Sequence, residues 1–162
     1  MGWKRFEVEI ESPVSASRFF KAAVVDSHNL VPKLVPQVIT GIKMIRDETT
    51  GRLFKRTEFS EFIPFRYTLD RVDVMDEKSC SFNYWLVEGG RLGKMYDAGD
   101  FELRVTPKSD GGSVLKLNGA YHAYEDVKVT EEDMNVGKLG LTAMYSAVEA
   151  YLVANPDAYA SE

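Results

Sequence analysis

Few side chains in this sequence have the types and spacing that acid–base, nucleophilic or metal chemistry requires. The histidines, His28 and His122, have no companion at metal-ligand spacing, so no metal site is predicted. Ser113 and Lys116 fit the S-x-x-K pattern of serine acyl-enzymes, but they follow a hairpin turn and should lie in a strand, where their side chains are not neighbours. Cys80 alternates with apolar residues, and a buried thiol in that setting usually acts as an inert apolar group.

Aromatic side chains are a stronger chemical signal. They make up 12% of the residues, and they include nine Phe and eight Tyr. Five of them should point inward from strands: Phe65, Tyr67, Phe82, Tyr84 and Tyr121. Such rings can fill a core or line a ligand cavity, and tyrosine suits a cavity because its apolar ring carries a hydroxyl group.

Composition limits the classes of protein that this chain can be. Its 162 residues suggest one domain, residues 1–162, which can bury a core without a disulfide or a structural metal. The net charge of −5 disfavours nucleic-acid and membrane partners, because both bind basic surfaces. One cysteine allows no internal disulfide, and no apolar run approaches the ~18 residues of a membrane span, so a cytoplasmic location is expected.

The first third of the chain predicts one strand and two short helices. Apolar and charged residues alternate over residues 6–10, which is typical of a half-buried strand. Ser15 is a suitable N-cap for a helix that runs to about Val25. A second helix should follow, and Pro32 and Pro36 should keep it short.

The middle of the chain reads as six further strands separated by turns. They are expected at about residues 38–45, 53–59, 65–74, 79–87, 101–105 and 114–122. In the strand over 65–74 the apolar phase jumps between Leu69 and Val72, which indicates a bulge.

The last third predicts one long helix from Thr130 to about Ala154, opened by a capping box and stopped by Asn155 and Pro156. Its expected inward stripe is unusually low in bulk: Val136, Leu139, Gly140, Ala143, Ala147 and Ala150. Small residues let a helix lie close to a sheet or leave space beneath it. The predicted fold class is α+β, with seven antiparallel strands curved around the long helix.

Several stretches resemble the plant pathogenesis-related proteins of class ten, the family of the major birch pollen allergen, Bet v 1. They follow the family's order over nearly the whole chain, at residues 32–37, 64–67, 70–73, 83–84, 87–90, 110–116, 121–122, 147–152 and 157–159. The Glu88-Gly89-Gly90 turn and the C-terminal run are the more specific of these matches.

The resemblance implies a helix-grip fold with a large apolar cavity between the sheet and the long helix. It also implies a monomeric, defence-related binder of hydrophobic plant metabolites or hormones, such as flavonoids, cytokinins or steroid-like compounds, without a cofactor. The family's cavity wall matches Phe59, Phe65, Tyr67, Asp70, Phe82, Tyr84, Leu115, Leu117, Tyr121, Lys138 and Gly140. The low-bulk stripe adds Leu139 and Ala143 as expected ligand contacts.

Two other functions remain open beside ligand binding. Some enzymes of alkaloid metabolism on this fold use a lysine, tyrosine and carboxylates at the cavity mouth for cyclisation, condensation or isomerisation, and Asp70 and Lys138 could serve such a role or sit in water at a rim. A ribonuclease function has been attached to family positions that match Glu149 and Tyr151. The family's glycine-rich loop is represented here by residues 47–51, with one glycine and two acids, so phosphate binding there is not expected.

Overall fold

The residues that the computed structural model describes, 2–160, contain seven strands, three α-helices and one π-helical segment. The strands are β1 (Trp3–Ser12), β2 (Ile39–Arg46), β3 (Leu53–Phe59), β4 (Tyr67–Asp76), β5 (Ser81–Gly89), β6 (Tyr96–Pro107) and β7 (Ser113–Ala123). The helices are α1 (Ala16–Phe20), the π-helical η1 (Lys21–Val25), α2 (Ser27–Leu34) and α3 (Glu131–Ala154). No helix in residues 2–160 is long and apolar enough to cross a membrane.

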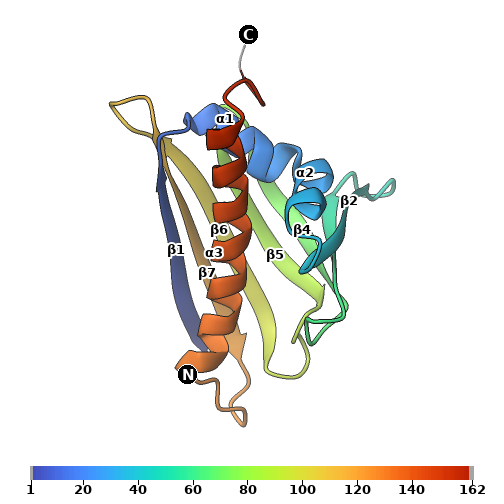
Figure 1. Ribbon diagram of the computed structural model, residues 1–162. Coiled ribbons are helices and arrows are strands. Elements are labelled where there is room, and N and C mark those ends of the chain that lie inside the picture. Colours follow the sequence, from blue (N-terminus) through green and yellow to red (C-terminus); the bar gives the residue numbers. More distant parts are fainter. Residues whose placement is uncertain (1, 161–162) are drawn as a thin grey trace.

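All seven strands form one antiparallel sheet in the order β1-β7-β6-β5-β4-β3-β2. Figure 1 shows the sheet curving around α3, with α1 and α2 beside the C-terminal end of that helix. The predicted fold class is therefore confirmed, including two short helical segments after the first strand. The first of these continues from α1 into η1, and the predicted end at Val25 is confirmed.

Local capping explains where the helices begin. The Ser15 hydroxyl accepts a hydrogen bond from the Arg18 amide at 3.3 Å, as expected of an N-cap. At α3, the Thr130 hydroxyl accepts from the Asp133 amide at 3.1 Å, and the Asp133 carboxylate accepts from the Thr130 amide at 3.0 Å. This reciprocal pair is the predicted capping box.

The inward faces of most strands match the predicted alternation, but β4 does not. The sequence predicted that Tyr67 and Leu69 point inward, with a bulge before Val72. In the structure Asp70 is buried and Thr68 lies on the same face, so Tyr67 points to the opposite face. The pairing of β4 with β5 shifts register between Leu69 and Asp70 and again beyond Val72. On this strand polar residues face the interior and apolar residues face outward, so the alternation of the sequence predicted the wrong inward face.

The inward face of helix α3 coincides only in part with the predicted stripe: Val136 and Gly140 line the cavity described below, and Ala147 packs against the core. Its buried residues are Met144, Tyr145, Val148 and Leu152. Val136 and Leu139 of the predicted stripe are 52% and 67% exposed, respectively. Because apolar residues occur on all sides of this helix, the helical period alone does not identify one inward stripe.

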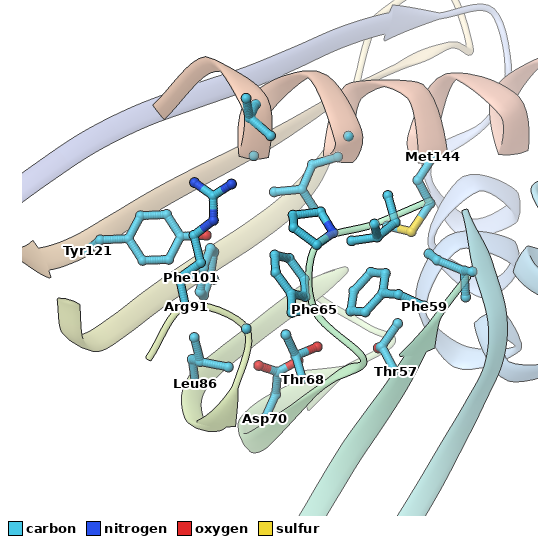
Figure 2. Close-up of a pocket in the computed structure, with 18 of the residues that line it drawn as sticks. Thr57, Phe59, Phe65, Thr68, Asp70, Leu86, Arg91, Phe101, Tyr121 and Met144 are labelled. Atoms are coloured by element: carbon cyan, nitrogen blue, oxygen red, sulfur yellow. The ribbon is translucent and has the colours of Figure 1, made fainter. Parts of the chain in front are cut away.

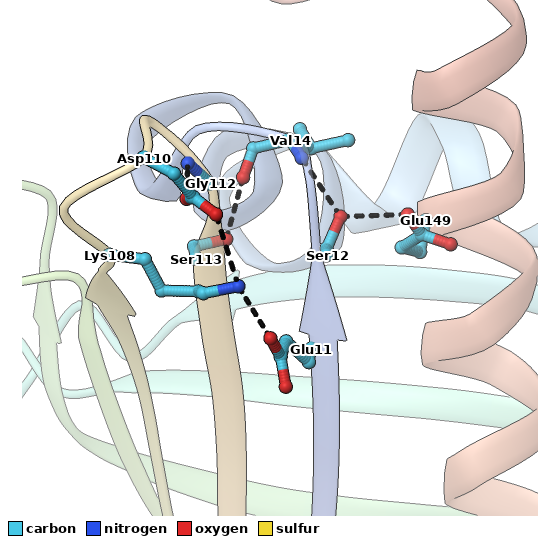
Figure 3. Close-up of polar contacts among 8 residues, drawn as sticks. All are labelled: Glu11, Ser12, Val14, Lys108, Asp110, Gly112, Ser113 and Glu149. Atoms are coloured by element: carbon cyan, nitrogen blue, oxygen red, sulfur yellow. Dashed lines mark hydrogen bonds and ion pairs between the residues drawn. The ribbon is translucent and has the colours of Figure 1, made fainter.

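A hydrogen-bonded corner joins β1 to β7 and α3 (Figure 3). The Ser12 hydroxyl donates to the Glu149 carboxylate at 2.7 Å and accepts from the Val14 amide at 3.0 Å. The Ser113 hydroxyl donates to the Val14 carbonyl at 2.7 Å. These bonds anchor the turn after β1, and they give Glu149 a structural partner.

Arg18 of α1 holds the C-terminal end of α3 in place. Its guanidinium donates to the carbonyl oxygens of Leu152, Asn155 and Ala158 at 2.9–3.1 Å. The last carbonyls of a helix have no partner within the helix, so a cation here satisfies them and favours the helix dipole. The C-terminal half of α3 is thus fixed, and the space beneath the helix lies toward its N-terminal half.

Candidate ligand-binding cavity

A cavity of about 220 Å³ lies between the sheet and the N-terminal half of α3. The segment between β3 and β4, residues 63–65, and the segment between β5 and β6, residues 90–95, border it at one end (Figure 2). An engineered apolar cavity of ~150 Å³ is enough to hold benzene. The space here therefore suits a molecule of one or two rings.

Aromatic rings form much of the cavity wall. Tyr84 and Phe101 stack with ring centroids 4.8 Å apart, and Tyr121 meets Phe101 edge-on at 5.5 Å. On the other side, Phe59 and Phe65 pack edge to face at 5.1 Å. Because each ring is held by another ring, this apolar surface is formed before any ligand arrives.

The wall that α3 provides is thin at two glycines. A Cβ atom added at Gly137 would lie 3.8 Å from the Tyr121 hydroxyl oxygen, across the cavity. Gly140 also lines the cavity, and a Cβ there would meet no atom within 4 Å. Gly137 is therefore the position from which a larger side chain would approach the Tyr121 hydroxyl across the cavity.

Two opposite charges are buried in this apolar wall. Lys55 and Asp70 are directly opposite each other in the pairing of β3 with β4, and both line the cavity. Only 8% of Lys55 and 7% of Asp70 is exposed. The Lys55 ammonium nitrogen lies 5.4 Å from the centre of the Phe82 ring. Within residues 2–160 neither side chain forms an ion pair within 4.0 Å, so both face the cavity with free polar atoms.

Burial shifts the titration of both groups toward their neutral forms. It raises the pKa of the Asp70 carboxyl to about 7, and the positive charge of Lys55 only partly opposes this rise. It also lowers the pKa of the Lys55 amine, against the opposing charge of Asp70. Burial raises the pKa values of Tyr84 and Tyr145, and the Asp70 charge adds to the rise at Tyr145. At Tyr84 the neighbouring Tyr145 contributes after burial, and Asp70 contributes after Tyr145. The tyrosines therefore stay protonated, while Asp70 can exchange a proton near neutral pH.

Six of the predicted site residues line the cavity: Phe59, Phe65, Asp70, Tyr84, Tyr121 and Gly140. Three others, Phe82, Leu115 and Leu117, are buried in the core, so they support the wall without forming its surface. Tyr67 lies on the opposite face of β4, where its hydroxyl donates to Glu88 at 2.9 Å. Lys138, Leu139 and Ala143 are on the exposed side of α3. These seven residues correct the expected cavity wall.

Residues that sequence reasoning missed include Lys55, Arg91, Gly137 and Tyr145, all of which line the cavity. A signal for Lys55 was present in β3. Strand residues two apart share a face, so the assignment of Phe59 to the cavity also implies an inward Lys55. A buried lysine is uncommon, so general tendencies favour an exposed position for Lys55 and conceal this signal.

Arg91 and Asp133 both line the cavity and form an ion pair across it. The Arg91 guanidinium, in the segment after β5, lies 3.9 Å from the carboxylate of Asp133 in the first turn of α3. Both side chains are partly exposed, so this pair contributes ~0–1 kcal/mol. The contact between the segment after β5 and the first turn of α3 is therefore weak.

The glycine-poor loop after β2 satisfies its polar groups internally. The Asp47 carboxylate accepts from the Thr49 amide at 2.9 Å, which lowers the pKa of Asp47. The Thr50 hydroxyl accepts from the Arg52 amide at 3.2 Å, and Arg46 donates to the Gly51 carbonyl at 2.7 Å. We expect no saturable amide shifts in residues 46–52 on titration with ATP or phosphate, as measured by NMR. Saturation below millimolar concentration would contradict this.

The remaining candidates for chemistry lie outside the cavity lining. Glu149, matched to a proposed ribonuclease position, is engaged by Ser12. His122 lies 2.7 Å from the Asp97 carboxylate, on a partly exposed site. Within residues 2–160, no three His, Cys, Asp or Glu side chains gather as metal ligands would. The cavity is thus the candidate site.

Comparison with known proteins gives consistent matches over the whole chain. The model of the pathogenesis-related protein Bet v 1 family matches residues 1–155. Pathogenesis-related protein STH-21 from Solanum tuberosum is 39% identical over 99% of this chain and 100% of its own length. Major pollen allergen Bet v 1-M/N from Betula pendula is 36% identical over 98% of this chain and 99% of its own length.

Solved structures give the same fold. The crystal structure of Ara h 8.0201 matches with a TM-score of 0.80 and 28% identity, over 95% of this chain and 100% of the other. Norcoclaurine synthase from Thalictrum flavum, in complex with dopamine and hydroxybenzaldehyde, matches with a TM-score of 0.71 and 18% identity. That match covers 99% of this chain and 90% of the other.

Proposed function

Because this chain belongs to the pathogenesis-related protein Bet v 1 family, we propose that it is a cytosolic plant defence-related protein that binds small hydrophobic metabolites or hormones in the cavity beneath α3. The observation that carries this proposal is an apolar cavity with a few converging polar groups, which is the usual form of a small-molecule site. Its volume of about 220 Å³ favours ligands of one or two rings among the classes that the family resemblance implies.

The contacts of the wall suggest how such a ligand lies. A planar ring would rest against the stacked Tyr84 and Phe101, because aromatic faces and edges attract one another. A polar substituent would be directed toward Lys55 and Asp70, which line the cavity and form no ion pair within 4.0 Å in residues 2–160. Ligands with one polar end and a flat apolar body are therefore preferred.

Blocking the cavity from the helix side is expected to weaken ligand binding. Replacement of Gly137 by Leu places four carbon atoms into the space beside the Tyr121 hydroxyl. The affinity for an uncharged two-ring fluorescent compound such as 2-naphthol should fall about tenfold or more. Helix propensity favours Leu over Gly by somewhat under 1 kcal/mol, so the protein should stay as stable or gain slightly.

Two matched variants separate cavity filling from other effects. Gly137→Ala gains helix propensity with little volume and should keep most of the affinity. Ala143→Leu adds a leucine on the exposed side of α3 and should leave the affinity unchanged. Fluorescence titration of the three variants measures both comparisons. Equal affinity of Gly137→Leu and the unaltered protein would argue against ligand binding in this cavity.

An enzyme of specialised metabolism that uses the same cavity is a second candidate function. The observation that favours it is the buried Lys55 and Asp70 pair, because perturbed acids and bases gather at catalytic sites. Norcoclaurine synthase, which shares the fold, has been captured with an amine and an aldehyde. A turnover assay on every compound that binds would distinguish this function from binding alone.

A further inference from the structure

We propose that Lys55 forms a reversible covalent imine with small aromatic aldehydes that enter the cavity. This inference rests on the proposed function, because the aldehyde must occupy the same cavity as any other ligand. It goes further by naming a chemical class of ligand and a reacting atom, the Lys55 side-chain nitrogen.

The position of Lys55 is the first support. It is the one lysine among the cavity-lining residues in the described part of the chain. Its backbone lies in the middle of β3, paired with β2 and β4 on either side, so the side chain starts from a rigid element. Because no carboxylate lies within 4.0 Å in residues 2–160, no tight ion pair blocks its nitrogen.

The surroundings of the nitrogen are the second support. The Phe82 ring lies beneath it at 5.4 Å, and Tyr84, Phe101 and Leu86 complete an apolar wall nearby. Such surroundings disfavour the ammonium form, and burial indeed lowers the pKa of Lys55. Each pH unit by which a lysine pKa falls gives about tenfold more of the neutral, nucleophilic amine. An aldehyde ring would share the same aromatic wall.

Asp70 supplies the proton transfer that imine formation needs. It faces the same cavity from the directly opposed position on β4. Its pKa of about 7 means that a carboxylic acid and a carboxylate are both populated near neutral pH. A group with a pKa near the working pH is the most effective proton donor and acceptor.

The step balances without any further reactant. The lone pair of neutral Lys55 attacks the carbonyl carbon, so a C–N bond forms and the carbonyl oxygen takes a proton from neutral Asp70. The nitrogen then returns one proton to the Asp70 carboxylate. When the C–O bond breaks, Asp70 protonates the leaving hydroxyl, and one water departs. The resulting protonated imine transfers its proton to the Asp70 carboxylate, and hydrolysis reverses the sequence.

The ligand class follows from size and polarity. A single-ring aldehyde fits a cavity of about 220 Å³ and places its flat face against Tyr84 and Phe101. Its carbonyl is the polar end that would lie toward Lys55. Benzaldehyde is the simplest compound with both features, and benzyl alcohol has nearly the same shape without an electrophilic carbon.

Reductive trapping tests the proposal directly. The full chain is incubated with benzaldehyde at neutral pH, sodium cyanoborohydride is added, and the intact mass and digested peptides are measured. We expect a mass increase of one benzyl group, with at least about tenfold higher occupancy at Lys55 than at any exposed lysine. Lys55→Met should lose this label, whereas Lys116→Met, at an exposed lysine paired with Glu9, should keep it.

The outcomes separate this proposal from the binding function. Titration with 2-naphthol reports on cavity binding, and excess 2-naphthol or benzyl alcohol should slow the labelling of Lys55. If 2-naphthol binds while benzyl groups spread evenly over exposed lysines, the imine proposal is wrong and cavity binding stands. If 2-naphthol does not bind and Lys55 stays unlabelled, both fail. If Lys55→Met does not fold, identification of the labelled lysines in the unaltered protein still tests the imine proposal.

Discussion

Replacing Lys55 by Met and Asp70 by Leu together is expected to raise the free energy of unfolding by about 1–4 kcal/mol at pH 7. Both charges are almost fully buried, and no ion pair closer than 4.0 Å within residues 2–160 compensates their lost hydration. Methionine has nearly the shape of lysine, and leucine has the branching of aspartate with two methyl groups in place of the carboxyl oxygens, whose slightly larger size the adjoining cavity can accept. Urea denaturation of the two proteins measures the difference.

The single variants are the controls for this experiment. Asp70→Leu alone leaves Lys55 without the charge that raises its pKa, and Lys55→Met alone leaves Asp70 without its opposing cation. Each should therefore be less stable than the double variant, and a double-mutant cycle gives the coupling between the two sites. A double variant less stable than the unaltered protein would show that the pair stabilises the fold.

The same pair predicts how stability depends on pH. The pKa of Asp70 rises from its ordinary value of 3.8 to about 7 on folding, so the folded state binds more protons than the unfolded state between these values. The contribution of Asp70 to stability is therefore fully present below pH ~4 and is lost as the pH rises through about 7, by at most ~1.4 kcal/mol per pH unit. The Lys55→Met and Asp70→Leu double variant should lose this slope. An unchanged slope would mean that other groups cause it.

Gly89→Ala is expected to lower the free energy of unfolding by at least about 3 kcal/mol. Gly89 ends β5 with a φ of +86°, a conformation that costs an L-residue ~1–2 kcal/mol. An added Cβ would also meet the Tyr67 carbonyl oxygen, which is backbone and cannot rotate away. The neighbouring Gly90 amide donates to that same carbonyl at 2.8 Å, and Gly90 borders the cavity. The variant should therefore weaken ligand binding as well.

Gly51→Ala is the matched control for the steric part of this loss. Gly51 has a similar φ of +75°, but a Cβ there would meet no atom within 4 Å. It should cost only the conformational ~1–2 kcal/mol, and it lies in the loop after β2, outside the cavity lining. Thermal and urea unfolding of both variants measure the difference. Equal losses at the two positions would mean that the close approach to Tyr67 is easily relieved.

Local sequence signals were enough to place most elements. The strand predicted over residues 53–59 has the bounds of β3, and the Thr130 cap marks the start of α3. Alternation in β5 and β6 also identified the inward faces, with Phe82 and Leu103 buried as expected. These signals succeed because a capping hydrogen bond or a half-buried strand depends on residues only a few positions apart.

The prediction of which face points inward was wrong where polar residues are buried and apolar residues are exposed. On β4 the polar Thr68 and Asp70 face inward and the aromatic Tyr67 faces outward, since a cavity replaces a dry core at this point. On α3 the exposed Leu139 resembles a core residue in every local respect. Such reversals depend on which residues of other elements pack against the strand or helix, and the periodicity of a single segment carries no information about those residues.

The cavity itself was expected from family resemblance more than from residue patterns. Matching the family's cavity residues to this sequence placed Asp70, Tyr84 and Tyr121 correctly on the cavity wall. Lys55 was missed because it stands in an otherwise ordinary strand, and a charged residue there is usually read as solvent-exposed. The general tendency of lysine to be solvent-exposed thus concealed Lys55, the residue with the most unusual chemistry in the cavity.

The pairing of β1 with β7 has a consequence for how the chain must be made. Trp3 pairs with His122 and Ser12 with Ser113, and β1 has no other neighbour in the sheet. A ribosome adds about 5–20 residues per second, so the partner strand emerges roughly 5–20 s after β1 does. Through that interval the nascent chain carries Val8 and its apolar neighbours on an unpaired strand edge, open to chaperones or to other chains. Translation pauses before residue 113 prolong this exposure, whereas pauses after residue 123 do not.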